Sequence, residues 1–128
     1  MTRPIIAPRR IEPLLLPFLR ERFPNVVFTT VKAAKTPSRE CLIVAEPQQL
    51  ASSISQYVRL RMSTYVTTET GYDFQAAQTL AGQIEAEILQ HGTMSPFIDA
   101  EHSSGPIRVA DENSIFAYSI ILMTVSVI

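Results

Sequence analysis

The stretch YVRLRMSTYVT, residues 57–67, has the most regular pattern in the sequence, an alternation of two kinds of side chain. The apolar set consists of Val58, Leu60, Met62 and Val66. The intervening set consists of Tyr57, Arg59, Arg61, Ser63 and Tyr65. Successive side chains of a β-strand point to opposite faces of a sheet. The pattern therefore predicts a strand with one face on a core and the other on solvent or a partner.

Two segments on either side of this strand have helical periodicity. Apolar residues recur every three or four positions from about Arg10 to Phe23 and again from about Asp73 to His91, which predicts two amphipathic helices. Pro13 fits the first turn of the first helix, where a missing N–H costs nothing. Pro17 predicts a kink or a later start of that helix, because it removes one backbone hydrogen bond.

Four further strands are predicted from apolar and β-branched stretches. They cover residues 26–31, 41–45, 107–110 and 115–128. The polar segments 32–40 and 46–55 are expected to connect strands, and residues 92–105 to form a long loop, a kind that is often functional. Residues 1–8 contain two prolines and are expected to form an extended N-terminal arm.

The predicted order of elements is α-β-β-β-α-β-β in a single domain of 128 residues. This order is typical of an α+β fold with one antiparallel or mixed sheet and both helices packed on one face. The expected core consists of Leu15, Phe18, Leu19, Val58, Leu60, Met62, Phe74, Leu80, Ile84 and Ile88.

Composition favours a protein that associates with other proteins. Charged residues make up 18% of the chain and hydrophobic residues 46%, whereas about a quarter of a typical domain is charged. The net charge of −1 gives no excess of basic groups for nucleic acid or an anionic membrane. The apolar run Leu14–Leu16 ends at Pro17, too short for a secretory signal, and no run is long enough to span a membrane.

No motif in the sequence predicts catalysis, a metal or a cofactor. Asp99, Glu101 and His102 could supply metal ligands or acid–base groups, but a solvated loop is the favoured interpretation. Cys41, the single cysteine, lies in an apolar strand, where a buried and inert thiol is expected. The chain has four glycines and no phosphate-binding loop, so we expect no enzymatic activity.

Two surfaces are candidate subunit interfaces. The outer side of the alternating strand presents Tyr57, Arg59, Arg61 and Tyr65, residue types enriched in protein interfaces and also able to stack on RNA bases. The last strand is apolar on both faces, so one face is covered either by another subunit or by the domain itself. The face chosen as an interface consists of Ile121, Met123, Val125 and Val127. Candidate partner-binding loop residues are Lys32, Lys35, Arg39, Phe97, Asp99, Glu101 and His102.

The layout resembles the tail terminator proteins of long-tailed bacteriophages and related phage-like particles. Five segments carry the resemblance, in order IEPLLLPFLRERFP, VVFTTVKA, CLIVA with YVRLRMSTYV, DFQAAQTLAGQIEAEILQ, and GPIRVADENSIFAYSIILMTVSV. Together they span about residues 10–128. The most suggestive part is the last, in which Gly-Pro, an apolar residue and Arg-Val precede a polar turn and a long strand.

The resemblance implies a structural virion protein that is made in the host cytoplasm and forms a ring, commonly a hexamer, on the tail tube. Its partners would be further copies of itself, the major tail tube protein and a head-completion or connector protein. DNA would only pass through the ring lumen. The ring would stop tube polymerisation and join the tail to the head. Alternatives are a head-completion or neck connector protein and, from another class, a small-molecule- or RNA-binding α+β domain.

Overall fold

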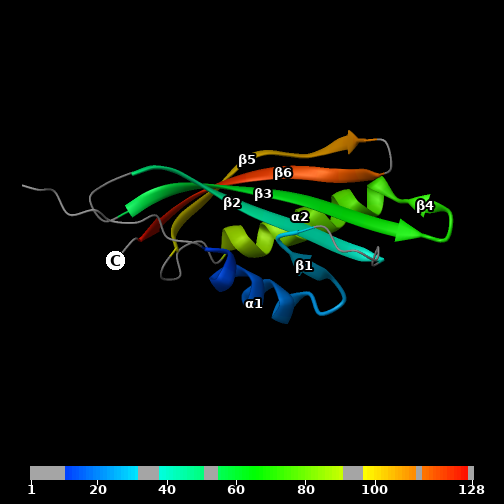
Figure 1. Cartoon of the computed structure of the whole chain (residues 1–128), viewed down its shortest axis with the longest axis horizontal. Helices are drawn as coiled ribbons and strands as arrows, with labels where there is room; N and C mark the ends of the chain where they lie inside the picture. The colour runs from blue at the N-terminus through cyan, green and yellow to red at the C-terminus, as the bar shows by residue number, and fades with distance from the viewer. Residues whose placement is uncertain (1–10, 32–37, 51–54, 91–96, 112–113, 127–128) are drawn as a thin grey trace, which may run out of the picture.

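The computed structural model describes residues 11–31, 38–50, 55–90, 97–111 and 114–126, which form a single sheet with two helices (Figure 1). The helices are α1 (Glu12–Arg22) and α2 (Phe74–Gln90). The strands are β1 (Val27–Thr29), β2 (Arg39–Leu50), β3 (Ser55–Thr68), β4 (Gly71–Tyr72), β5 (Phe97–Ala110) and β6 (Ile115–Ser126). The predicted α+β class is confirmed, and the short β4 is an addition to the expected order.

The sheet is mixed, with the strand order β1-β2-β3-β6-β5 and β4 paired to β3. Strand β1 runs parallel to β2, and the other pairs are antiparallel. Leu60 in β3 lies opposite Ala45 in β2 and Ile121 in β6. The alternating segment that opened the sequence analysis is therefore at the centre of the sheet, flanked by the long strands β2 and β6.

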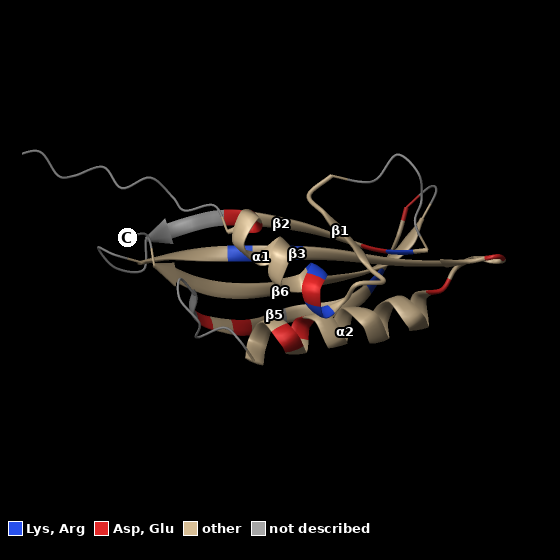
Figure 2. Cartoon of the chain, turned by 90° about the horizontal axis from the view of Figure 1, so that it is seen from below, with Lys and Arg blue, Asp and Glu red and all other residues tan. Residues whose placement is uncertain are grey.

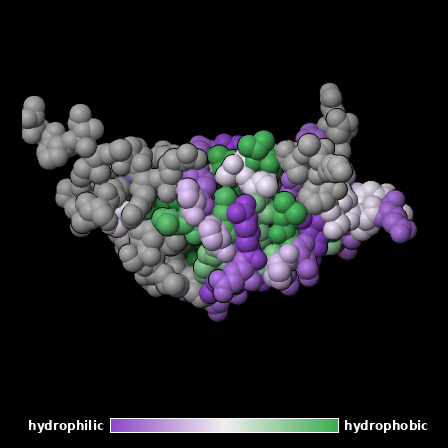
Figure 3. All heavy atoms as spheres, turned by 60° about the horizontal axis from the view of Figure 1, so that its bottom comes forward, coloured by the Kyte–Doolittle hydropathy of each residue, from purple (hydrophilic) through white to green (hydrophobic). Residues whose placement is uncertain are grey.

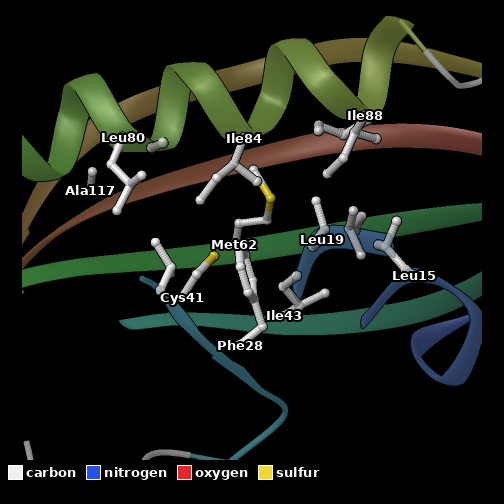
Figure 4. Packing of buried hydrophobic residues seen from close by; sticks show 14 of the residues in the cluster. Leu15, Leu19, Phe28, Cys41, Ile43, Met62, Leu80, Ile84, Ile88 and Ala117 are labelled. Carbon is white, nitrogen blue, oxygen red and sulfur yellow. The ribbon is translucent and has the colours of Figure 1, made fainter. Parts of the chain in front are cut away.

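Both helices pack on one face of the sheet, here called the inner face, and enclose the core (Figure 4). Side chains from α1 and α2 meet Cys41 and Ile43 of β2 and Met62 of β3 in the space between helices and sheet. All ten predicted core residues belong to this core, with Phe18 and Phe74 partly buried at its margin.

Helix α1 accommodates both of its prolines. It begins at Glu12, two residues after the predicted start, with Pro13 in its first turn, and it continues past Pro17 to Arg22. Leu15 and Leu19, on either side of Pro17, are buried at 2% and 0% exposure, so the apolar contact of the helix with the core is uninterrupted.

Two segments expected to be connections are strands. Residues 46–50 extend β2, and residues 97–105 form the first part of β5. Their partners β3 and β6 are long, and pairing with them satisfies backbone groups that a loop would leave to water. Register shifts in β5 at Phe97/Asp99, His102/Ser104 and Ser104/Ile107 disrupt the alternation by which a strand is predicted.

Gly105 is required where β5 lies close against the backbone of β6. Its φ of +84° is disfavoured for other residues, and a Cβ there would lie 2.2 Å from the carbonyl oxygen of Tyr118. Within the part of the chain that the structure describes, no helix is long and apolar enough to cross a membrane.

Candidate interface on the outer face of the sheet

The outer face of the sheet, opposite the two helices, carries large apolar side chains that are half exposed. Val44 of β2, Tyr57 of β3 and Leu122 of β6 are 40%, 42% and 41% exposed, and Ile107 of β5 is 54% exposed. The register of the strands places all four on this face. Figure 3 shows another side of the molecule, the one where α1 lies, and there hydrophilic side chains border the hydrophobic ones.

Arg61 links three strands across the middle of this face. Its guanidinium donates hydrogen bonds to the Glu46 carboxylate of β2 and to the Tyr118 hydroxyl of β6, the latter over 2.9 Å from Nε. The hydrogen bond from Arg61 holds the pKa of the Glu46 carboxyl below its usual range, so the pair is ionised at neutral pH. A charge-assisted group of this kind fixes the geometry of the exposed surface.

Tyr65 is not exposed, contrary to the prediction. It is 6% exposed and packs against Phe116 of β6, with ring centroids 4.8 Å apart, and against Tyr72 of β4 at 6.3 Å. Burial raises the pKa of its hydroxyl to about 12. The neighbouring strands cover this end of the outer face, so Tyr65 stabilises the monomer and does not form part of an open contact surface.

The interface face predicted for the last strand is also wrong. Ile121, Met123 and Val125 are 0%, 1% and 0% exposed, because they point into the core beneath the helices. Leu122 faces outward, and Ile120 on the same side is 8% exposed. Val127 lies outside the described residues. The sequence showed two apolar faces, and the helices cover the one that had been chosen as the interface.

A pocket of about 260 Å³ opens where β3, β6 and β5 lie side by side. It is lined by Tyr57, Asp99, Glu101, Leu122, Met123 and Thr124. The strand register explains the grouping, because Thr124 lies between Tyr57 and Asp99, and Leu122 lies opposite Glu101. Residues predicted for two separate surfaces, the strand face and the loop, thus share one site. Acidic residues mark this part of β5 (Figure 2).

His102 is separated from Asp99 and Glu101, since it lies on the helix side of β5. Its Nε2 is 2.7 Å from the Gly105 carbonyl oxygen and 3.4 Å from a carboxylate oxygen of Glu85 in α2. Because a carbonyl oxygen can only accept a hydrogen bond, Nε2 of His102 carries a proton and donates a hydrogen bond to the Gly105 carbonyl oxygen. Burial raises the pKa of the Glu85 carboxyl, an effect that His102 opposes. The three residues therefore do not form one metal or acid–base site, because successive strand residues point to opposite faces, and they lie in β5 where a solvated loop was expected.

The last group of candidates comprises a possible metal site, the cysteine thiol and the remaining loop residues. Among the described residues, no three His, Cys, Asp or Glu side chains are grouped so as to hold a metal ion. The buried Cys41 thiol accepts a hydrogen bond from Thr64 over 3.6 Å, and burial raises its pKa to about 12. Arg39 and Phe97 begin β2 and β5 and are not in loops. Lys32 and Lys35 lie outside the described residues.

Sequence reasoning missed three polar residues that shape these surfaces. Glu46 was assigned to a connecting segment, and Tyr118 and Glu85 were not singled out. For Glu46 a weak signal existed, since it directly follows the strand predicted for residues 41–45. The partners of Tyr118 and Glu85 are on distant segments, which one sequence does not reveal.

No protein-family model matches the chain, and no curated protein is significantly similar to it.

Proposed function

We propose that this chain is a ring-forming subunit of a virion, the tail terminator on the head-proximal end of a phage tail tube. In this role it associates with further copies of itself, with the major tail tube protein and with the head connector. DNA passes through the ring lumen without being read. The proposal combines the layout resemblance with the exposed surface of the sheet.

The observation that carries the proposal is the outer face of the sheet, which neither described helix covers. It presents half-exposed Val44, Tyr57 and Leu122 around the Arg61 group. Apolar and aromatic side chains near an arginine are typical of the centre of protein interfaces. A heterologous contact between such a face and a different surface of the next copy closes into a ring when its rotation allows.

The same face argues against an RNA-binding sheet. Of the four residues that could have stacked on bases or bound phosphates, Tyr65 is buried and Arg61 is paired with Glu46. Glu46, Asp99 and Glu101 add negative charge to the face. Nucleic-acid binding depends on unpaired basic groups. Protein association therefore accounts better for this surface.

Electron microscopy of the purified protein, alone and mixed with tail tubes, tests the proposal. We expect rings at one end of each tube and shorter tubes when the protein is present during polymerisation. Rings that bind only isolated heads or connectors would favour the alternative, a head-completion protein. Single copies scattered along the tube, with no contact between subunits, would refute a ring-forming role.

A further inference from the structure

We propose that the pocket formed by β3, β5 and β6 binds residues 1–10 of a neighbouring copy of the chain. This segment consists of the predicted N-terminal arm, residues 1–8, and the two arginines that follow it, and the ten residues together are called the arm below. The inference rests on the proposed assembly into a ring, and it names the segment that occupies this part of the outer face. It makes the arm a strap from one subunit to the next.

The pocket combines negative charge with apolar surface. Asp99 and Glu101 of β5 bring two carboxylates to it, and one carboxylate oxygen of Asp99 accepts the backbone N–H of Ala100 over 2.9 Å. Tyr57 and Leu122, each about two-fifths exposed, supply an aromatic ring and an apolar surface between the acids and β3. A ligand that matches such a site carries positive charge beside apolar groups.

Arg59 is the basic group of the outer face nearest to this pocket in the strand register, because it lies opposite Leu122. On its other side it lies opposite Glu46 of β2, and its charge acts on that carboxyl. The carboxylates of β5 are on the far side of Leu122 from Arg59. No Lys or Arg is therefore among the described residues that line the pocket, and its two carboxylates are available to a cation.

The arm has the complementary composition. Its sequence MTRPIIAPRR contains three arginines, two adjacent isoleucines and no acidic residue. Pro4 and Pro8 restrict the residues before them to extended conformations, which lowers the entropy lost on binding. Ten residues reach at most about 33–36 Å, enough to cross a subunit boundary.

The attachment of the arm favours a neighbouring subunit as its binding site. The arm joins the domain at Ile11, which is fully buried on the inner face. The next residue, Glu12, accepts the backbone N–H of Ala45 over 3.4 Å, at the β2 side of the sheet. The pocket opens on the opposite face and at the β5 side. An arm that leaves one subunit at its β2 side and enters the next at its β5 side forms the head-to-tail contact that a ring requires.

A peptide-binding experiment tests the pocket without requiring a ring. The probe is a fluorescent peptide of sequence MTRPIIAPRR, and the receiver is the full chain in which the three arm arginines are replaced by glutamate, so that its own arm does not compete. Fluorescence anisotropy should show saturable, salt-sensitive binding. Absence of binding at millimolar peptide would overturn the inference.

Matched variants of the receiver locate the site. Asp99→Asn with Glu101→Gln removes two charges from the pocket, and we expect binding about tenfold weaker, the factor for a few partly exposed ion pairs. Glu21→Gln with Glu69→Gln removes the same charge from exposed positions elsewhere, and we expect unchanged affinity. An equal loss in both variants, or none in the first, would overturn the inference.

Mixing two full-length variants distinguishes a neighbouring subunit from the same chain. One variant has alanines in place of the arm arginines, and the other carries Asp99→Lys and Glu101→Lys in the pocket. Each should remain monomeric by light scattering, and their mixture should form heterodimers through one intact arm and one intact pocket. A mixture that stays monomeric while the peptide binds the pocket would overturn binding between subunits. Rings on tubes are scored separately, so failure of the tail-terminator role leaves this result interpretable.

Discussion

Replacement of Leu60 by alanine should lower the free energy of unfolding by about 3–4 kcal/mol. Leu60 is fully buried at the centre of β3, between Ala45 and Ile121 and beneath the helices. The substitution removes three carbon atoms, worth about 2.4 kcal/mol at about 0.8 kcal/mol for each buried methylene group. The cavity left in a core that relaxes only partly adds a further cost, and measured Leu→Ala losses span about 2–5 kcal/mol.

The assay is urea unfolding followed by circular dichroism, at protein concentrations low enough that assembly does not contribute to stability. Leu122→Ala is the matched control, because it deletes the same atoms from the outer face of the adjacent strand, where Leu122 is 41% exposed. We expect the control to cost about 1 kcal/mol or less. A loss at Leu60 below about 1 kcal/mol, or no larger than at Leu122, would refute the assignment of inner and outer faces.

Three further predictions concern the outer face, the thiol and a buried carboxyl. Leu122→Asp should give a folded monomer that no longer assembles, whereas Val125→Asp should unfold the chain, because an unpaired charge in the core is costly. Light scattering reports assembly and circular dichroism reports folding, and a folded Val125→Asp protein would contradict the placement of Val125 in the core. Cys41, whose pKa is raised to about 12, should react with a thiol reagent at pH 8 only after urea unfolding, so rapid labelling of native protein would show that it is accessible. Burial raises the pKa of Glu85 above 4.5, so its ionisation opposes folding as the pH rises past that value. As the pH rises from 4.5 to 8, Glu85→Gln should therefore become more stable relative to the wild type, measured as the difference between their urea midpoints. Midpoints of the two proteins that change in parallel with pH would rule this out.

The elements with an uninterrupted period were predictable from sequence alone. The alternation in residues 57–67 predicted β3 and its inner face, and the apolar stripe of residues 73–91 predicted α2 within a residue at each end. The first part of β5 was missed because its register shifts and Gly105 interrupt the alternation. A strand that bulges against its partner satisfies its hydrogen bonds without a regular side-chain pattern.

The site was less predictable, because its geometry depends on contacts between distant segments. Tyr65 has the same pattern as Tyr57, yet only Tyr65 is covered, by Phe116 and Tyr72. The pocket joins Tyr57 to Asp99, more than forty positions along the chain, through the pairing of β3, β6 and β5. Periodicity assigns a residue to one face of its strand, and only the strand order shows which residues of different strands become neighbours on that face.

The position of β6 between β3 and β5 has a consequence for how the protein folds during synthesis. Strand β3 ends at Thr68, but its partner β6 begins at Ile115, so the central pair closes only when the last of the described strands has left the ribosome. Until then β3 has an unpaired edge and an apolar inner face, a combination that favours aggregation. Contacts so distant in sequence also slow folding. A chain that stops before β6 should therefore leave this edge of β3 unpaired and be prone to aggregate.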